Sequence, residues 1–299
     1  MRTKRESCLM RYQENLADYS PLKEDFQGPK PFVKWVGGKR QLLPEIEKRL
    51  PSIMNTYFEP FIGGGAVMWS LDKSRLNSIV INDYNSELAN LYEVVKKDVF
   101  ALAEDLKIHE NTSEYYYEIR KLDRSDAFQK LSPVQRASRF IYLNKTGYNG
   151  LYRVNSKGQN NVPFGRYKNP NIVDSSNLVA CSAFLSDVKI LNGDFENIKN
   201  MIGRDDFVYL DPPYVPLTAT SNFTGYTKNG FDADMQVRLR DFCNYINDKG
   251  ANFMLSNSSA PMIYDLYEGY NIHEVMANRA VNCKASGRGK IKELLITNY

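Results

Sequence analysis

Strand-like and helix-like segments alternate along most of this chain, and this alternation restricts the possible folds more than any other feature. Six runs of mainly apolar, aromatic or β-branched residues have the length of strands: 57–61, 78–82, 188–191, 207–210, 252–256 and 291–297. Apolar residues at helical spacing follow the second run, from Leu88 to Val95, and precede the fifth, from Met235 to Ile246. This order predicts a doubly wound α/β fold, an open and mostly parallel sheet with helices on both faces and ligands at the carboxyl ends of its strands.

One segment interrupts the alternation and differs from the rest in charge. The chain carries 39 Lys and Arg against 35 Asp and Glu, a net charge of +4, yet no acid occurs from Ala127 to Val173, where Lys and Arg contribute +8. The remainder therefore sums to 4 − 8 = −4. Aromatic and Asn residues are interleaved with these cations, and the segment lacks a clear helical period. Because cations neutralise phosphates, amides read base edges and rings stack, the segment favours a nucleic acid partner.

We expect three parts in the chain. Residues 31–84 and 176–299 would form the core with the sheet, and residues 85–175, which include the acid-free segment 127–173, would form an inserted lobe. Residues 1–30 are polar and of mixed charge, so they are typical of an N-terminal extension, to which we assign no role. Since no apolar run approaches the roughly 18 residues that span a bilayer, we expect a cytoplasmic protein without a membrane partner.

Cysteine and histidine are too scattered to build a metal site. The chain has four cysteines without CxxC spacing and two histidines, and they lie at Cys8, His109, Cys181, Cys243, His273 and Cys283. We therefore expect reduced thiols and no metal cofactor.

A glycine-rich turn joins the first strand-like run to a helix. Gly63, Gly64 and Gly65 would let the backbone approach a ligand closely. Asp83 ends the next strand 20 positions after Gly63, where its carboxylate could accept hydrogen bonds from ribose hydroxyls. This spacing suits a dinucleotide or a nucleoside such as S-adenosylmethionine, and the turn by itself does not separate the two.

Asp211-Pro212-Pro213-Tyr214 directly follows the apolar run 207–210 and narrows the chemistry. Two prolines fix this loop at the mouth of the sheet. The carboxylate of Asp211 and the backbone carbonyl of Pro212 can accept both hydrogens of an exocyclic amino group, while Tyr214 offers a ring for stacking. Accepting both hydrogens draws the conjugated nitrogen towards a tetrahedral form whose lone pair attacks an electrophilic methyl group. Together with the glycine turn, the loop predicts amine methylation without a metal or a covalent intermediate.

Ordered motifs from about Lys30 to Tyr299 resemble those of the Dam-type, D12 class DNA adenine-N6 methyltransferases of the α motif order, in the GATC-specific branch with Dam-like and Dpn-like enzymes. The matching pieces are Lys34-Trp35-Val36-Gly37-Gly38-Lys39, Phe58-Glu59-Pro60-Phe61 with Gly63 and Gly65, Asn82-Asp83, Leu143-Asn144 with residues 147–151 and Arg153, residues 161–167, and Asp211 to Tyr214. The resemblance implies a class I, Rossmann-like methyltransferase core with an inserted DNA-recognition lobe. Val36 and the N-terminal extension depart from the family pattern.

By this resemblance, S-adenosyl-L-methionine is the methyl donor, S-adenosyl-L-homocysteine is its product, and no metal takes part. The family implies that Trp35 and Lys39 close over the donor, that Asp83 holds its ribose, and that Asp194 and Phe195 border its adenine. The remaining cofactor-binding residues would be Phe61, Gly63, Gly65 and Asp211. The catalytic residues, which would hold a flipped target adenine, are Asp211, Pro212, Pro213 and Tyr214.

The resemblance also implies double-stranded DNA as the partner and GATC as the target. The DNA-binding residues would be Lys34, Tyr148, Asn149, Arg153, Pro163, Arg166 and Tyr167. An Arg can pair with guanine O6 and N7, a Tyr can enter the base stack as the adenine leaves, and an Asn can cap the orphaned base. We expect a monomer that is associated with the nucleoid. A cognate restriction endonuclease could act on the same target sequence, but we do not expect the two proteins to bind each other.

Several alternatives stay open. Related enzymes recognise longer sites such as GATATC, and the biological role could be restriction protection, repair or regulatory marking, or service to a mobile element. A cytosine-C5 enzyme is excluded because its nucleophilic Cys typically follows Pro, and none of the cysteines here does. An N4-cytosine enzyme, an RNA-adenine or protein-glutamine methyltransferase, and a catalytically silent DNA-binding regulator remain. In place of Asp211, N4-cytosine enzymes usually carry Ser and protein-glutamine methyltransferases usually carry Asn.

Overall fold

The computed structural model describes residues 28–216, 231–278 and 290–299. The predicted N-terminal extension therefore lies outside the described residues up to position 27, and so do Cys8 and Cys283. No helix within the described ranges combines the length and the apolar character that a bilayer-spanning segment needs.

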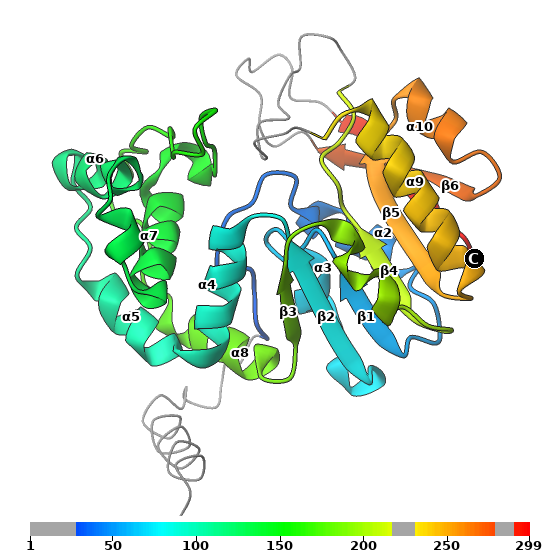
Figure 1. Ribbon diagram of the computed structural model, residues 1–299, viewed down its shortest axis with the longest axis horizontal. Helices are drawn as coiled ribbons and strands as arrows, with labels where there is room; N and C mark the ends of the chain where they lie inside the picture. The colour runs from blue at the N-terminus through cyan, green and yellow to red at the C-terminus, as the bar shows by residue number, and fades with distance from the viewer. Residues whose placement is uncertain (1–27, 217–230, 279–289) are drawn as a thin grey trace, which may run out of the picture.

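A seven-stranded sheet organises the chain (Figure 1). Its strands are β1 (Thr56–Glu59), β2 (Ser78–Asp83), β3 (Lys189–Asn192), β4 (Phe207–Leu210), β5 (Asn252–Ser258), β6 (Asn271–Asn278) and β7 (Lys290–Thr297). They lie side by side in the order β3-β2-β1-β4-β5-β7-β6. The first five strands pair in parallel, whereas β7 is antiparallel to both β5 and β6. The predicted doubly wound, mostly parallel sheet of the class I, Rossmann-like type is confirmed, and β6 is a strand that the sequence analysis did not predict.

One face of the sheet packs against helices near the N-terminal half of the chain. Because successive side chains of a strand point to opposite faces, Tyr57, Ile79 and Phe207 belong to the core on this side. The helices that cover it are α2 (Leu43–Glu47), α3 (Ala66–Ser70), α4 (Ser86–Lys97) and α8 (Ser175–Leu185). A buried side chain such as Leu91 of α4 stabilises the fold by about 2 kcal/mol through the apolar area it removes from water.

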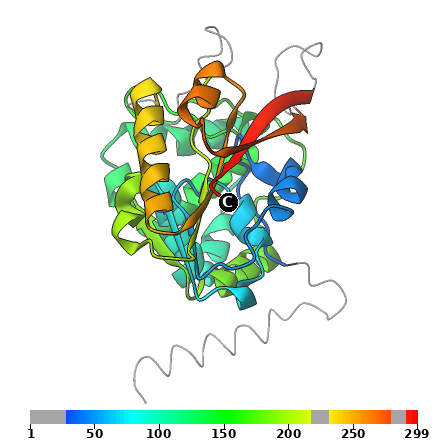
Figure 2. The same ribbon diagram turned by 90° about the vertical axis from the view of Figure 1, so that its right-hand side faces the viewer.

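The opposite face has its own core. Phe58, Val80 and Val208, each next to a residue of the first core, point to this side and are buried with Phe242. The elements that cover it are η6 (Phe195–Met201), α9 (Ala233–Asp248) and α10 (Pro261–Leu266). Figure 2 shows α9, in yellow and orange, on the opposite side of the sheet from the blue N-terminal helices. Parallel strands buried on both faces account for the near-continuous apolar runs of the sequence.

The strand order reverses direction between β1 and β4, which are direct neighbours. The chain leaves β1 towards β2 and β3, then returns to build β4 and β5 on the other side of β1. Such a switch point opens a crevice at the carboxyl ends of the strands, where ligands of doubly wound sheets bind. The glycine turn after β1 and the Asp211 loop after β4 both begin there.

A helical lobe stands beside the sheet at the left of Figure 1. It contains α5 (Val99–Lys107), α6 (Ser113–Lys121), η3 (Leu122–Arg124), η4 (Phe128–Lys130), α7 (Pro133–Thr146) and η5 (Tyr148–Gly150). A small separate core forms around Tyr116, Tyr142 and Leu143. Helix α7 also packs against α4, which in turn contacts β2 and β3, so α7 connects the lobe to the sheet.

The acid-free segment contains helix α7 of 14 residues although its sequence lacks a clear helical period. Its residues from Ala137 to Asn144 are all buried, so no polar stripe gives the sequence a helical period. The signal that could have located the helix is its start. Ser132 and Gln135 form a reciprocal capping box with Pro133 at the first helical position.

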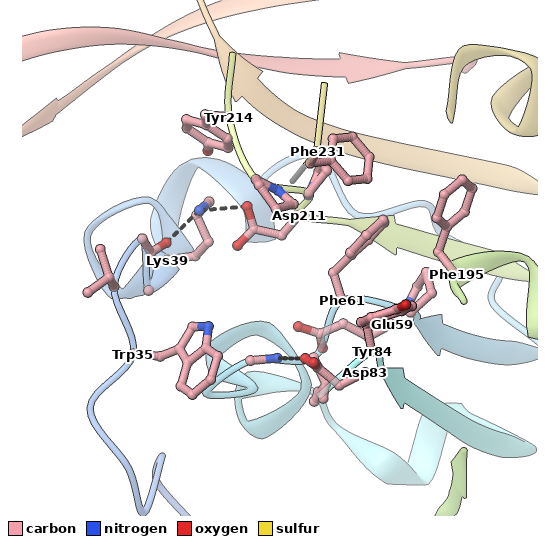
Figure 3. A pocket seen from close by; sticks show the side chains of 18 of the residues that line it. Trp35, Lys39, Glu59, Phe61, Asp83, Tyr84, Phe195, Asp211, Tyr214 and Phe231 are labelled. Atoms are coloured by element: carbon pink, nitrogen blue, oxygen red, sulfur yellow. Dashed lines mark hydrogen bonds and ion pairs between the residues drawn. The ribbon is translucent and has the colours of Figure 1, made fainter. Parts of the chain in front are cut away.

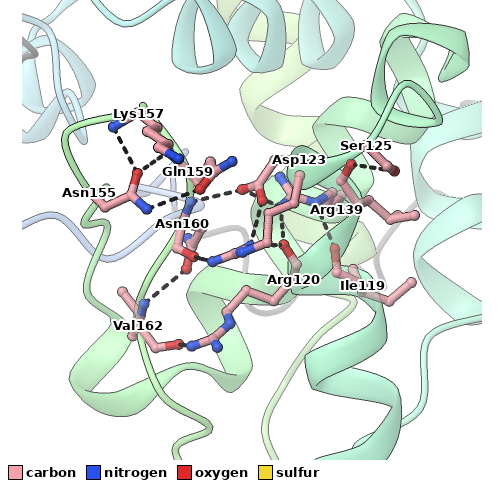
Figure 4. A network of polar contacts seen from close by, with 12 residues as sticks. Ile119, Arg120, Asp123, Ser125, Arg139, Asn155, Lys157, Gln159, Asn160 and Val162 are labelled. Carbon is pink, nitrogen blue, oxygen red and sulfur yellow. Dashed lines mark hydrogen bonds and ion pairs between the residues drawn. The ribbon is translucent and has the colours of Figure 1, made fainter.

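Two cations of the acid-free segment form ion pairs within the protein and are not free charges on its surface. Arg136 pairs with Glu87 of α4, and the buried Arg139 pairs with Asp123 over 2.8 Å. Asp123 also accepts from the backbone N–H of Asn160 over 2.8 Å, so it joins η3, α7 and the strand-like residues after η5 (Figure 4). Acids outside the segment thus neutralise part of its +8, and the sequence count overstates the exposed charge.

Candidate cofactor and target-base site

A single cavity of about 840 Å³ lies at the carboxyl ends of the central strands. It is lined by all twelve residues predicted to bind the cofactor or carry out catalysis, namely Trp35, Lys39, Phe61, Gly63, Gly65, Asp83, Asp194, Phe195, Asp211, Pro212, Pro213 and Tyr214. In Figure 3, the labelled side chains of this set converge from the segment before β1 and from the ends of β1, β2, β3 and β4; they are Trp35, Lys39, Phe61, Asp83, Phe195, Asp211 and Tyr214. The volume is within the range of small-molecule sites.

The glycine turn and Asp83 form one hydrogen-bonded unit. The backbone N–H of Gly63 donates to Asp83 Oδ2 over 3.0 Å, and that of Asn85 donates to Oδ1 over 2.9 Å (Figure 3). Burial raises the pKa of Asp83 to about 6, although both hydrogen bonds favour the ionised form. Gly63 has a φ of +46°, and a Cβ there would lie 2.6 Å from the ring of Trp35. The turn therefore requires glycine both for its backbone and for the space that Trp35 fills.

Glu59 is a cavity residue that the sequence analysis did not assign to the site. It ends β1 with 3% exposure and accepts from Tyr57 Oη over 2.7 Å and from the backbone N–H of Met68 over 3.2 Å. Burial raises the pKa of Glu59 to about 8. Its place as the last strand residue before Pro60, at the carboxyl end of β1, is the signal that could have identified it.

Aromatic rings and one ion pair form the far wall of the cavity. Phe61 and Phe195 stack with ring centroids 5.4 Å apart, and Phe231 meets Phe61 edge-on at 5.9 Å. Arg238 of α9 donates two hydrogen bonds of 2.7 and 2.9 Å to the carboxylate of Asp194, and its guanidinium lies over the Phe195 ring. Nothing in the sequence indicated Arg238, because its partner lies 44 positions away.

The loop predicted to be catalytic begins at Asp211, which faces Lys39. Lys39 Nζ lies 2.7 Å from Asp211 Oδ1 and 4.8 Å from the centroid of the Tyr214 ring (Figure 3). Burial raises the pKa of Asp211 above its usual range, while the Lys39 ammonium favours the ionised form. Tyr214 Oη donates to Glu293 Oε2 of β7 over 2.8 Å. Lys39 and Glu293 thus hold the two ends of the proposed base pocket, and Glu293 was not predicted.

The residues predicted to bind DNA gather outside the cavity, around η5. Tyr148 donates its backbone N–H to the carbonyl of Pro163 over 2.9 Å, and Lys34 Nζ lies 5.2 Å from the centroid of the Tyr167 ring. Arg153 is held by Asn161, whose Oδ1 accepts from its Nε over 2.6 Å. The exposed members of the set are Lys34, Tyr148, Asn149, Arg153, Pro163 and Arg166. The structure therefore brings together residues that the sequence spreads over more than 130 positions.

Asn144 joins the two sites. This buried residue of α7 accepts from the backbone N–H of Lys34 over 2.8 Å, and its Nδ2 donates to the carbonyls of Lys34 and Gly150, each over 2.9 Å. One amide therefore fastens the segment that leads to Trp35 and Lys39 onto the turn that carries Tyr148 and Asn149. The sequence analysis counted Asn144 among the interleaved Asn residues that could read base edges, whereas the structure buries it between two backbone segments.

No group of three or more His, Cys, Asp or Glu side chains is arranged to hold a metal ion in the part of the chain that the structure describes. The carboxyl groups of Asp83, Asp194 and Asp211, which line the cavity together with four others, and the aromatic rings suit a cationic ligand that has an aromatic base.

Comparisons with known proteins identify a family model and several relatives of this chain. The family model of D12 class N6 adenine-specific DNA methyltransferases matches residues 35–281. The type II methyltransferase M1.LlaDCHI of Lactococcus lactis subsp. cremoris is 49% identical over 274 residues, which cover 90% of this chain and 95% of that protein. The type II methyltransferase M.MjaIII of Methanocaldococcus jannaschii is 47% identical over 291 residues, with coverage of 90% and 99%. The DNA adenine methylase of Escherichia coli K12 is 35% identical over 274 residues, with coverage of 88% and 93%.

Proposed function

Because this chain belongs to the D12 class of N6 adenine-specific DNA methyltransferases, we propose that it methylates adenine within GATC in duplex DNA after the base leaves the helix for the Asp211–Tyr214 loop. The observation that carries the proposal is the shared cavity, in which the glycine turn with Asp83 adjoins the catalytic loop. A donor and an amino group bound there would lie side by side. Exposed Lys34, Arg153 and Arg166, outside the cavity, support duplex DNA as the partner.

The cavity fits S-adenosyl-L-methionine, which supplies an electrophilic methyl group when bound. We assign the ribose to Asp83, whose buried carboxylate already accepts two backbone hydrogen bonds and directs the Gly63 turn towards the ligand. Phe61 and Phe195 would flank the adenine of the donor, next to the Asp194–Arg238 pair. The carboxylates of Asp83 and Asp211 give the cavity negative charge that favours a sulfonium and an ammonium.

The target amino group is assigned to Asp211 and to the backbone carbonyl of Pro212. The Pro212 carbonyl is always an acceptor. The Asp211 carboxyl can accept with either oxygen only when it is ionised, and the ammonium of Lys39 favours that state from 2.7 Å away. Accepting both N–H hydrogens concentrates the lone pair on the nitrogen that attacks. Tyr214 would stack on the adenine, and its ring is held by Glu293 at the hydroxyl.

We assign target recognition to the predicted lobe, residues 85–175. Tyr148 at 53% exposure and Asn149 in the left-handed conformation project from η5, which suits residues that enter a base stack. Two relatives are type II methyltransferases, and this supports a role in protecting the sites of a restriction endonuclease. The nuclease would share the target sequence without being bound.

The test of this function is transfer of labelled methyl groups to duplexes that contain GATC, GATATC or a scrambled site, followed by nucleoside analysis. N6-methyladenine restricted to the GATC duplex is the expected product. The same product in another sequence would retain the chemistry and overturn the target. N4-methylcytosine, or methylation of RNA only, would overturn the assignment of the base.

Arg153→Ala is expected to weaken discrimination at one guanine of the target by about 1–3 kcal/mol, because a bidentate contact to O6 and N7 would be lost. The measurement is kcat/KM for duplexes that differ from GATC at that guanine alone. Lys130→Ala, at an exposed cation of the same acid-free segment, is the matched control. It should reduce binding equally for all sequences. An unchanged preference in Arg153→Ala would remove this residue from base readout.

Cofactor affinity should depend on pH through Asp83. Its pKa of about 6 lies above the ordinary range, so the carboxylate accepts ribose hydrogen bonds above pH 6 and is progressively protonated below it. Asp83→Asn is expected to weaken S-adenosyl-L-homocysteine binding on the order of 10- to 100-fold at pH 7.5. At pH 5 the ratio of the two Kd values should be several-fold smaller, as calorimetry can measure. Taking the ratio cancels contributions from Glu59, and a ratio that is constant with pH would contradict the assignment.

A further inference from the structure

Side chains hold the backbone of the loop from Pro212 to Pro216. Three of its five residues are prolines and have no N–H to donate. Among the described residues, no turn or loop hydrogen bond joins this backbone to another backbone group. Its hydrogen bonds instead come from side chains of α9 and β5. Because backbone pairing does not fix the loop, its position depends on these side chains.

Two amides form a chain behind the loop. Gln236 of α9 donates from Nε2 to the carbonyl of Pro213 over 3.1 Å and accepts at Oε1 from Asn257 Nδ2 over 3.1 Å. Asn257 Oδ1 in turn accepts from the backbone N–H of Ser258 over 2.8 Å and of Val215 over 3.4 Å. The amide chain therefore reaches the loop on both sides of Tyr214.

Burial makes this chain rigid and keeps it away from ligands. Gln236 is 1% exposed and Asn257 is 0% exposed, and neither lines the cavity. A buried amide that loses its partner keeps the desolvation penalty, so the two side chains strongly favour the one arrangement that satisfies both. Ser258 provides a further hydrogen bond to the loop, because its Oγ donates to the carbonyl of Val215 over 2.7 Å.

We infer that Gln236 and Asn257 are positioning residues for methyl transfer, which direct the Pro212 carbonyl and the Tyr214 ring at the target base. The inference rests on the proposed role of the Asp211–Tyr214 loop. A shift of about 1 Å in a reacting geometry lowers the rate by about 100-fold. Because the amides reach the loop and not the ligand sites, they affect the rate of the chemical step and leave the affinities for donor and DNA nearly unchanged.

Gln236→Met tests the inference, because it keeps the length of the side chain and removes both hydrogen bonds. The expected result is a 10- to 100-fold lower single-turnover rate, with Kd values for S-adenosyl-L-homocysteine and for DNA within about threefold of the wild type. Asn257→Leu combined with Gln236→Met should slow the reaction no further than the slower single variant, since both act through one chain. Gln236→Asn, whose amide is one methylene shorter, is the milder variant if Gln236→Met fails to fold, with an expected loss of about tenfold.

Asn298→Leu is the matched control. Asn298 also joins backbone groups of this part of the sheet, accepting from the N–H of Phe253 and donating to the carbonyl of Ala251, but at the far end of β5. It should lower the melting temperature without a specific loss of rate. A Gln236 variant as fast as this control, or one that fails through weaker binding, would overturn the inference.

In these rate measurements, every variant receives unmethylated genomic DNA as the substrate. The quantity measured is the total amount of N6-methyladenine formed, whatever the sequence around it. A wild-type enzyme that methylates adenine outside GATC therefore overturns the proposed target and leaves this comparison intact. Absence of N6-methyladenine with the wild type would overturn both.

Discussion

Asp211→Ala is expected to lower the rate of methyl transfer on the order of 1,000-fold or more while the protein still binds DNA. The variant loses an acceptor for the target amino group, so the nitrogen lone pair stays conjugated with the ring. It also leaves the ammonium of Lys39, which is only 5% exposed in the structure, without the carboxylate of Asp211 as its partner. Single-turnover methylation and fluorescence anisotropy with a GATC duplex measure the two effects separately.

Asp211→Asn separates charge from shape in the same experiment. The amide retains the size of the carboxyl group but directs a donor at one of the two positions where acceptors are needed, so we expect it to be nearly as inactive. DNA affinity should stay within about tenfold in both variants, because the proposed DNA contacts lie around η5, outside the cavity. Turnover within a few-fold of the wild type would refute the mechanism.

Asp123→Ala is expected to destabilise the helical lobe by about 3 kcal/mol and to leave the sheet folded. Asp123 and Arg139 are 11% and 9% exposed, and loss of the carboxylate leaves a buried guanidinium with only carbonyl partners (Figure 4). Hydrogen exchange should become faster in α6 and around Tyr142 of α7, which share a small separate core with Tyr116, while β1, β4 and β5 remain protected. Denaturant titration gives the free energy of unfolding.

Asp126→Ala is the control for this prediction. Asp126 is exposed, three residues along the chain, and its replacement should change stability by less than about 0.5 kcal/mol. Asp123→Ala should further weaken specific DNA binding and retain S-adenosyl-L-homocysteine binding. Equal effects of the two substitutions would show that the Asp123 pair does not stabilise the lobe.

Six of the seven strands were predictable because each is short, mainly apolar and followed by a turn or a carboxylate. Residues 207–210, for example, became β4 with the predicted bounds. β6 was missed because it is an edge strand of mixed polarity, in which exposed Glu274 and Met276 alternate with buried Val275 and Ala277. α7 was missed for the opposite reason, since burial on all sides removes the polar stripe that indicates a surface helix.

The cavity residues that follow strand ends, such as Asp83 and Asp211, could be expected to lie together because the place of strand ends in a doubly wound sheet is fixed. Trp35 and Lys39 precede β1, and only the family resemblance indicated them. The partners of the cavity residues could not be predicted. Glu293, Arg238 and Gln236 reach the site from elements that only the completed fold brings close, and nothing near them in the sequence distinguishes them. The same limit made Arg139 resemble a free cation, because its acid lies outside the acid-free segment.

The Asn144 hydrogen bonds restrict how recognition could be exchanged between relatives. A graft of residues 85–175 from another enzyme would bring in a new residue at position 144 but leave the native Lys34 backbone and Trp35 behind. Trp35 also stacks on Tyr152 of the lobe at 5.6 Å, so the seam would cut through a packed interface. Segment 33–39 and the lobe therefore have to be exchanged together. A chimera that receives both from one relative should change its target sequence and still bind the methyl donor.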